Sequence, residues 1–314
     1  MSQLWVDTGQ GYMASDVLSE TWRTSLQPIT RFRQFCDVQA AIGTGAGEKY
    51  VWPIFGDTVD NGSRRLDETQ KMPETSFPMY QGEVVMSEYG ISVPSTLKYE
   101  TMSQYNMPAV ITKTLKNDAN RSFDREAHAA FDSTILRAVG SSTATISLTD
   151  NSTPSGANNV NMLKGHVKTL RDIMEERNIP VFDGEDYMCV ARPTTFSPLV
   201  DDLESVFQYT TEGYTRIVNG ERGRYSSIRF VTQTNVESEG WSNGKSDAAY
   251  FFGADTVTEA IAVSEELRGK IPDDYGRGRG VAWYYIGAFA ITHANTTNEE
   301  SKRQARIIKW DSTT

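Results

Sequence analysis

The residues of this 314-residue chain that could do chemistry are few and scattered. The segment Gly43–Lys49 (GTGAGEK) combines glycines with a lysine, as phosphate-binding loops do. Such a loop needs two glycines separated by four residues, followed by Lys and then Ser or Thr at the start of a helix. Here Lys49 precedes Tyr-Val-Trp, a sequence typical of a strand. The segment is therefore interpreted as a flexible glycine hinge between two ordered segments.

Two further motifs have a chemical and a structural interpretation. Residues 273–280 (DDYGRGRG) alternate Gly and Arg beside a tyrosine, and such a segment could contact a single nucleic-acid strand by charge and stacking. We favour a mobile surface loop between strands. Asp201, Asp202 and Glu204 could form a carboxylate pair for acid–base work. They lie at adjacent positions of a predicted helix without a third partner, which indicates a solvated helix face.

The histidines and cysteines do not form a recognisable site. His128, His166 and His293 are far apart in the sequence, and we expect the first two at the surface or at the edge of a core. Cys36 and Cys189 are also distant and form no CxxC motif, which argues against a disulfide framework and a structural zinc site. No GxSxG motif occurs. We therefore predict no enzyme activity, no metal and no cofactor.

Composition excludes several other classes. The formal net charge is −10, whereas a dedicated nucleic-acid binder needs a basic patch for the phosphates. Hydrophobic residues make up 38% of the chain and aromatic residues 11%, which is too much for a disordered protein. The uncharged run at 281–292 is shorter than the roughly 20 residues that a membrane helix needs, and the N-terminus does not resemble a secretory signal. The length favours about two domains.

The N-terminal half predicts an arm, an extended hairpin and a long helix. Leu18, Trp22 and Leu26 form one apolar stripe in residues 1–45, too little for a core, so this arm packs on something else. Residues 46–100 lack helical periodicity and contain strand-like segments at 50–55 and 83–93. We predict a long hairpin that projects from the body, with a disordered charged insert as the alternative. Its charges need partners that another subunit could supply; they are Arg64, Arg65, Asp67, Glu68, Lys71 and Glu74.

Apolar residues recur every four positions over 107–139, which predicts a helix with Pro108 in its first turn. Because such a stripe drifts about 40° per step, this helix must pack on different elements along its length. A linker at 150–159 leads to helices from 160 and 193 and to strands at 187–191, 228–236, 248–252, 281–291 and 306–310. The strand at 281–291 is apolar on both faces and is predicted to be central.

This element order resembles the HK97-like fold of tailed-phage major capsid proteins. Three phrases look like the family typified by the major capsid protein of phage N4: residues 174–193 (MEERNIPVFDGEDYMCVARP), 220–236 (GERGRYSSIRFVTQTNV) and 87–93 (SEYGISV). The resemblance spans roughly residues 45–292 and implies an α+β chain that assembles into a shell.

The resemblance also implies a subdivision of the chain. Residues 1–45 would be the N-terminal arm, 46–100 the E-loop over a neighbouring subunit, 101–150 the peripheral (P) domain with its spine helix, 151–280 the axial (A) domain, and 281–314 strands that return to the P domain. In the Gly- and Arg-bearing loop from residue 213, the residues implied to face the capsomer axis are Arg216, Glu221, Arg222 and Arg224.

The implied partners follow from the same resemblance. The subunit would form pentamers and hexamers with itself, and would meet a portal protein and, in some phages, a decoration (cement) protein. It would enclose dsDNA non-specifically, with no membrane contact, in a virion assembled in the host bacterial cytoplasm. No long charged segment resembling a fused scaffold precedes the arm, so we expect a separate scaffolding protein and no maturation cleavage.

Three alternatives remain open at this point. An encapsulin-like cellular compartment would use the same fold with a cargo-docking groove and no portal. A tail or baseplate protein would form rings or tubes but no shells. A nucleic-acid-handling enzyme would use the 273–280 loop and show a metal-dependent activity.

Overall fold

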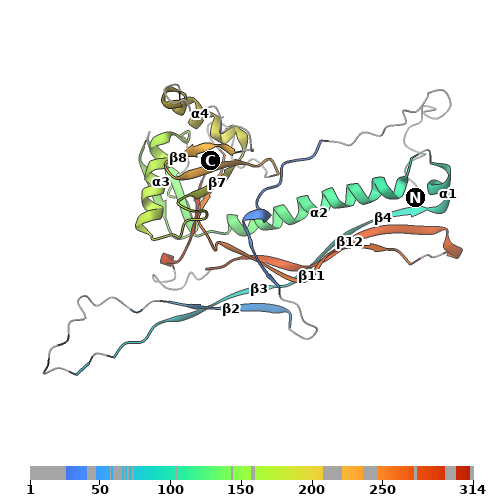
Figure 1. Cartoon of the computed structure of the whole chain (residues 1–314), viewed down its shortest axis with the longest axis horizontal. Coiled ribbons are helices and arrows are strands. Elements are labelled where there is room, and N and C mark those ends of the chain that lie inside the picture. The colour runs from blue at the N-terminus through green and yellow to red at the C-terminus, as the bar shows by residue number, and fades with distance from the viewer. Residues whose placement is uncertain are drawn as a thin grey trace.

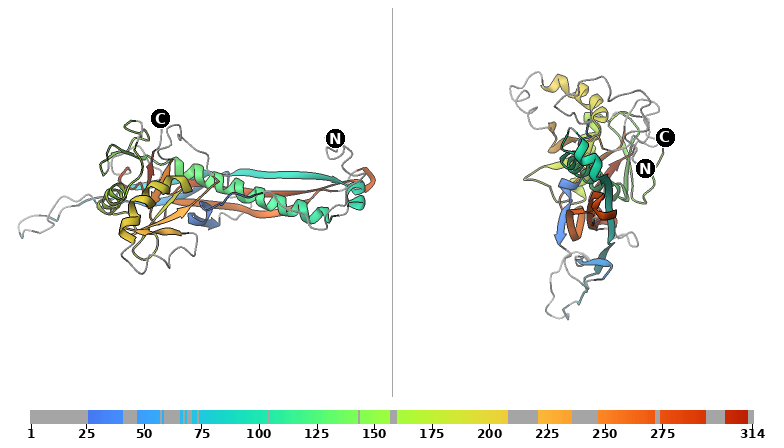
Figure 2. Two further views of the ribbon diagram at one scale, coloured as in Figure 1. Left: turned by 90° about the horizontal axis from the view of Figure 1, so that it is seen from above. Right: turned by 90° about the vertical axis from the view of Figure 1, so that its right-hand side faces the viewer.

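The computed structural model describes residues 26–40, 47–56, 74–103, 105–142, 144–156, 160–207, 221–235, 247–271, 274–293 and 302–311, together with Thr58, Leu66, Glu68, Lys71 and Met72. Of residues 204–207 and 221–222 only the backbone is described. Figure 1 shows an α+β chain with a globular part at one end, a long arm carrying α2, and a projecting hairpin of β2 and β3. The hairpin and the far tip of the arm point to opposite ends of the long axis (Figure 2).

Strands and helices are interspersed along the described part of the chain. They are β1 (Asp37–Ala40), β2 (Lys49–Phe55), β3 (Met79–Val85), β4 (Ser87–Thr96), α1 (Leu97–Met102), α2 (Met107–Asp132), β5 (Leu136–Gly140), β6 (Ile146–Thr149), α3 (Lys164–Glu176), β7 (Tyr187–Ala191), α4 (Pro193–Phe207), β8 (Glu221–Tyr225), β9 (Ile228–Thr232), β10 (Ala249–Phe252), β11 (Val257–Gly269), β12 (Gly278–Ile291) and β13 (Ile307–Trp310). A 3₁₀ turn, Arg33–Phe35, precedes β1.

Helix α2 packs on two different sheets, as its drifting apolar stripe predicts. Its first half places Ile111, Leu115, Ala119 and Phe123 against Trp283 and Tyr285 of β12. Its last turns place Ala127, Ala130 and Phe131 in a second core with residues of β7, β10 and β13. The helix starts with the Ala109 N–H donating to the side chain of Asn106 at 3.4 Å. It therefore joins the arm to the globular part.

The helix is shorter than the sequence pattern predicted. It ends at Asp132, and residues 136–140 form β5, so the predicted helix over 107–139 is corrected to 107–132. The Ser133 hydroxyl donates to the Ala130 carbonyl at 2.8 Å and caps the last turn. An apolar spacing of four cannot separate helix from strand here, because four is also two periods of a strand. Ile135 and Val139 fit both.

The long arm that carries α2 is built on a four-stranded sheet in the order β1-β11-β12-β4. Strand β12 lies inside it, antiparallel to both β11 and β4, which confirms the prediction of a central strand at 281–291. Val281, Trp283 and Tyr285 point toward α2, so the residues between them face away from the helix. The predicted strand at 83–93 is two strands, since β3 pairs with β2 and β4 pairs with β12.

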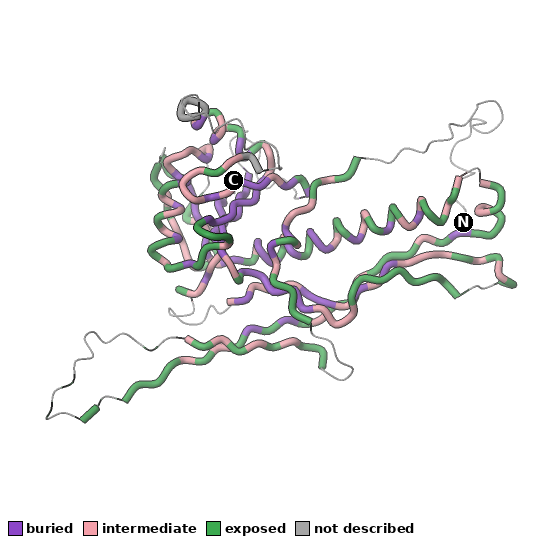
Figure 3. The backbone as a smooth tube through the Cα atoms, in the orientation of Figure 1, coloured by how far each residue is buried: buried purple, intermediate pink, exposed green. Residues whose placement is uncertain are grey.

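The globular part contains a seven-stranded sheet in the order β6-β5-β13-β10-β7-β9-β8. Strand β7 alternates between two cores: Tyr187, Cys189 and Ala191 pack with α3 and α4, while Met188 and Val190 pack with the end of α2. Figure 3 shows most buried residues gathered in this part. The predicted strands at 187–191, 248–252 and 306–310 and the helix at 193 are confirmed, and the helix expected from 160 begins at Lys164.

Each of the two sheets combines strands from distant parts of the sequence. Strand β11, within the segment 151–280 expected as the A domain, hydrogen-bonds to β12 in the four-stranded sheet. Strands β5, β6 and β13, from the segments expected as the P domain, lie in the seven-stranded sheet. The chain therefore crosses between the arm and the globular part several times.

Candidate assembly surfaces

The projecting hairpin exposes apolar side chains that the described part of the chain does not cover. Phe55 is 63% exposed, Met79 62% and Phe77 53%, and the rings of Phe55 and Phe77 lie 6.3 Å apart. An exposed apolar patch on a monomer typically marks an interaction site. The hairpin β2–β3 therefore carries one candidate contact surface along its own length.

Only part of the predicted charge set of this hairpin can be placed. Arg64, Arg65 and Asp67 lie outside the described residues, whereas Glu68, Lys71 and Glu74 are exposed. The Lys71 ammonium lies 3.7 Å from the Glu74 carboxylate, and both side chains are about nine-tenths exposed. Such a pair contributes about 0–1 kcal/mol to stability, so these charges can change partners at little cost.

The base of the hairpin is fixed to the arm. Trp52 Nε1 donates to the Thr292 carbonyl at 2.9 Å, and Val84 packs with Ala260 and Ala288 of the four-stranded sheet. A Cβ at Gly82 would lie 2.3 Å from the Trp52 ring. Glycine at this position lets the indole lie flat on β3, so the hairpin leaves the body in a defined direction.

Three of the four candidates for the capsomer axis belong to β8, the strand at one edge of the seven-stranded sheet. Arg216 lies outside the described residues, and Glu221 and Arg222 are on β8 without described side chains. The loop expected over 213–224 therefore ends earlier, because Glu221–Tyr225 pairs with β9. Arg224 Nη2 binds Asp186 Oδ1 at 2.6 Å, beside Arg229 at 2.7 Å. Arg224 is thus held against its own chain.

The N-terminal arm is anchored where it reaches α2. Of its predicted packing residues, Leu18 and Trp22 lie outside the described residues, and Leu26 is 99% exposed. The following Phe32 is fully buried, and its ring lies 5.3 Å from Phe131 and 5.4 Å from Tyr250. Exposure at Leu26 and burial at Phe32 place the root of the N-terminal arm between α2 and β10.

Two buried carboxylates bind the root of the N-terminal arm at Phe32 and Arg33. Neither carboxylate was predicted from the sequence. Asp124 of α2 accepts the Phe32 N–H at 2.8 Å, the Asn235 amide at 3.1 Å and the Gln233 amide. Its position three before Ala127 and seven before Phe131 is the signal that could have found it. A polar residue at that spacing lies on the buried face of the helix.

The second carboxylate, Glu259 of β11, is fully buried. Arg33 Nη2 binds it at 2.8 Å and Glu265 at 3.0 Å, with the guanidinium 4.5 Å from the Phe123 ring centre. Burial lowers the pKa of Arg33, but its hydrogen bonds to both carboxylates and their negative charges together outweigh this and raise its pKa above the ordinary value. Tyr285 adds its O–H to Glu259 at 3.0 Å.

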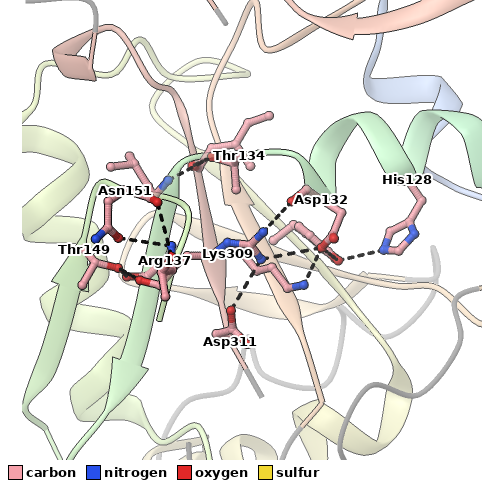
Figure 4. A network of polar contacts seen from close by, with 12 residues as sticks. His128, Asp132, Thr134, Arg137, Thr149, Asn151, Lys309 and Asp311 are labelled. Carbon is pink, nitrogen blue, oxygen red and sulfur yellow. Dashed lines mark hydrogen bonds and ion pairs between the residues drawn. The ribbon is translucent and has the colours of Figure 1, made fainter. Parts of the chain in front are cut away.

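A polar network closes the junction between α2 and the globular part (Figure 4). The Tyr250 hydroxyl donates to Asp132 Oδ1 at 2.8 Å and lies 2.8 Å from His128 Nε2. Lys309 of β13, almost fully buried, binds the same carboxylate. Burial would raise the pKa of Asp132, yet the hydrogen bonds from Lys309 and Tyr250 and the charges of Lys309 and Arg137 together outweigh it, and the pKa is lowered. Burial lowers the pKa of His128, which favours its neutral form.

The motifs considered for chemistry have structural roles. Asp202 accepts the Lys164 N–H at 3.0 Å at the start of α3, and Asp201 is exposed. His166 is fully buried, which corrects the expectation of a surface or core-edge position. Its Nδ1 accepts the Leu163 N–H at 3.1 Å at the start of α3.

Among the described residues, no three His, Cys, Asp or Glu side chains are grouped to hold a metal ion. None of the described helices is long and apolar enough to cross a membrane.

Several solved structures of similar architecture are chains of phage capsids. A chain in the capsid of Ralstonia phage GP4 aligns at 14% identity over 97% of this chain and 96% of its own, with a TM-score of 0.68. A chain in the capsid of Cyanophage Pam1 aligns at 14% identity over 100% of both, with a TM-score of 0.65. The capsid of Cyanophage P-SCSP1u gives 14% identity, 96% and 93% coverage and a TM-score of 0.63.

No protein-family model matches the sequence, and no curated protein matches it significantly. Since the structural alignments span nearly the whole chain, they establish the fold: this is the HK97-like fold of phage capsids, as the element order predicted.

Proposed function

We propose that this chain is the major capsid protein of a tailed phage, a structural subunit that builds an icosahedral shell around dsDNA. The observation that carries this proposal is the alignment of nearly its whole length, including the hairpin and the long arm, with chains of phage capsids. In a chain of this elongated shape, much of the surface is not covered by other residues of the same chain. Many of its exposed apolar residues lie on the hairpin and at the tip of the long arm, where other subunits can reach them.

The subdivision expected from the sequence is part of this proposal. Residues 1–45 are assigned as the N-terminal arm, 46–100 as the E-loop, 101–150 as the P domain with its spine helix, 151–280 as the A domain and 281–314 as the return strands. The exchanged strands β11, β5, β6 and β13 then connect the P and A domains into one body. We also propose that the chain belongs to the branch typified by the phage N4 major capsid protein, on the three sequence phrases quoted above.

The proposed partners follow from a shell role. Copies of this chain form pentamers and hexamers, a portal protein occupies one vertex, and a separate scaffolding protein guides closure in the host cytoplasm. A decoration protein can bind outside, and dsDNA is enclosed without sequence preference. The net charge of −10 favours enclosing DNA without gripping it.

Weak, repeated contacts suit this role. Exposed charge pairs contribute about 0–1 kcal/mol each, so a wrongly placed subunit can leave, while repetition over a closed shell supplies the total stability. Shells also need heterologous contacts, in which different patches of one subunit meet. The hairpin and the tip of the long arm that carries α2 give one chain more than one such patch.

The charges of the hairpin provide the test. Reversing Arg64 and Arg65 to Glu is expected to leave the subunit folded, because both belong to the stretch of sequence that connects β2 with β3, and to block shell formation. Circular dichroism reports folding and electron microscopy reports shells. Reversing Lys113 and Lys116 on α2 changes the net charge equally and is the control. Normal shells from the Arg64/Arg65 double variant would refute the role assigned to this segment.

A further inference from the structure

His128 lies on α2 where the root of the N-terminal arm (residues 29–36) contacts the helix. Its ring centre lies 5.0 Å from that of Phe32 in the root and 5.2 Å from that of Tyr250 on β10. The same imidazole is part of the polar network at the junction between α2 and the globular part (Figure 4). His128 therefore connects this network to the N-terminal arm.

The surroundings of His128 favour its neutral form. The Tyr250 hydroxyl donates to Asp132 Oδ1 at 2.8 Å, so its oxygen accepts from His128 Nε2, which lies 2.8 Å away. The charged groups that face the imidazole are Asp124 and Asp132 on α2 and Lys309 on β13. Burial and the charge of Lys309 lower the pKa of His128, and together they outweigh the two carboxylates.

Of the two rings that cover the imidazole, Phe32 can move away at the lower cost. Tyr250 belongs to β10, which hydrogen-bonds to β13 on one side and to β7 on the other. The root is a single segment held mainly through side chains at a few separate points, and Ile29 within it is 44% exposed. A protonated His128 also attracts Asp124, one turn earlier on α2, whose carboxylate accepts the Phe32 N–H.

We propose that His128 is a pH sensor that releases the root of the N-terminal arm when it takes up a proton. Once Phe32 has moved away, water reaches the imidazole and its pKa returns toward the ordinary histidine value of about 6.5. The open root then binds more protons than the closed root. The closed root is therefore fully favoured above about pH 6.5 and loses this advantage as the pH falls toward the lowered pKa.

The two native cysteines can report this opening. Cys36 lies at the end of the root, with its Sγ 3.6 Å from the Phe32 carbonyl oxygen, whereas Cys189 is fully buried on β7. The full-length, unassembled subunit is treated with a thiol reagent that reacts in mild acid, such as 4,4′-dithiodipyridine, and mass spectrometry gives the rate at each cysteine. The rate in the denatured chain divided by the native rate, at the same pH, is the protection factor.

We expect the protection factor of Cys36 to fall about three- to tenfold between pH 7.5 and pH 5.5. Tenfold is about the largest ratio that a titration at about pH 6.5 allows one unit lower. The protection factor of Cys189 should not change, because α2 and both sheets stay folded. Asp132 does not contribute, since its pKa is lowered and it stays ionised at pH 5.5.

A histidine variant separates the sensor from a packing role. His128→Gln keeps an N–H donor for Tyr250 but cannot become charged, so the protection factor of Cys36 should be the same at both pH values. A role in packing alone would lower it equally at both. His166→Gln is the matched control, since that buried histidine packs on Trp310 in the other core, and it should leave the pH dependence of Cys36 intact.

Three results would overturn the sensor. They are equal protection of wild-type Cys36 at both pH values, an equal fall at Cys189, which would indicate global unfolding, and a pH dependence that persists in His128→Gln. The comparison of the two wild-type cysteines decides by itself if the variant does not fold. Because unassembled subunits are measured, failure of the sensor leaves the shell function untouched, and failure to form shells leaves the sensor untouched.

Discussion

Asp124 is the buried acidic residue of helix α2. Its carboxylate is 2% exposed and accepts hydrogen bonds from a backbone N–H and two side-chain amides. These donors come from the arm root and from the segment after β9, so one side chain joins three parts of the chain. Donors left unsatisfied in a buried site cost far more than a surface contact gains.

Replacing Asp124 with Ala should therefore lower the free energy of unfolding by about 3 kcal/mol or more, because buried donors lose a charged acceptor. Denaturant unfolding followed by circular dichroism measures the change. Asp172→Ala is the matched control, since that carboxylate is 64% exposed and should cost less than about 0.5 kcal/mol. Equal effects of the two substitutions would contradict the structural role of Asp124.

Asp132 makes stability depend on pH. Its pKa is lowered in the folded protein, since the hydrogen bonds from Lys309 and Tyr250 and the charges of Lys309 and Arg137 together outweigh burial, while an Asp side chain in the unfolded chain titrates at about 3.9. Its contribution is therefore fully present above about pH 5 and is lost as the pH falls through the folded pKa. Asp132→Asn should lower the free energy of unfolding more at pH 7 than at pH 3. Denaturant titrations at both values test this, and an equal loss at both would count against it.

The exposure of Glu68, Lys71 and Glu74 could be predicted from the sequence, while their role in a contact stays a prediction. Asp124 and Glu259 could not be found in this way, because the residues of the N-terminal arm that bind them lie more than 90 positions away in the sequence. Pairing across such distances exists only once both sheets and α2 are in place.

At the scale of elements, periodicity located the long helix but not its end. The stripe continues past Asp132 because a spacing of four suits both a helix and one face of a strand. The interior position of β12 in its sheet was predictable because its sequence is apolar on both faces, although the side chains that face away from α2 stay partly exposed. The pairing of β1 with β11 and of β5 with β13 was not, since neither strand carries a local signal for a distant parallel partner.

The attachment of the hairpin depends on Gly82. A methyl group there would overlap the Trp52 ring, which must then leave β3 and lose its hydrogen bond to Thr292. Gly82→Ala should thus speed limited proteolysis within the hairpin severalfold and leave the thermal midpoint of the globular part nearly unchanged. The control is Gly156→Ala, where the added methyl meets no atom within 4 Å. Unchanged cleavage in Gly82→Ala would show that the indole does not fix the hairpin.

At the scale of the whole molecule, the chain builds one compact end and leaves two extended surfaces for others. The seven-stranded sheet and its helices hold most of the core, whereas the hairpin and the arm tip stay largely exposed (Figure 3). An elongated subunit with uncovered apolar side chains at both ends is poorly suited to remain alone. The resemblance of the element order predicted this shape, which composition and periodicity alone could not.

The most direct test of the proposed function is electron microscopy of the purified protein, first alone and then with a candidate scaffolding protein. We expect closed icosahedral shells, or spirals and aberrant shells that become uniform when scaffold is added. A stable monomer under every condition would contradict the shell function and would return attention to the Gly-Arg turn at 273–280 as the site of a different activity.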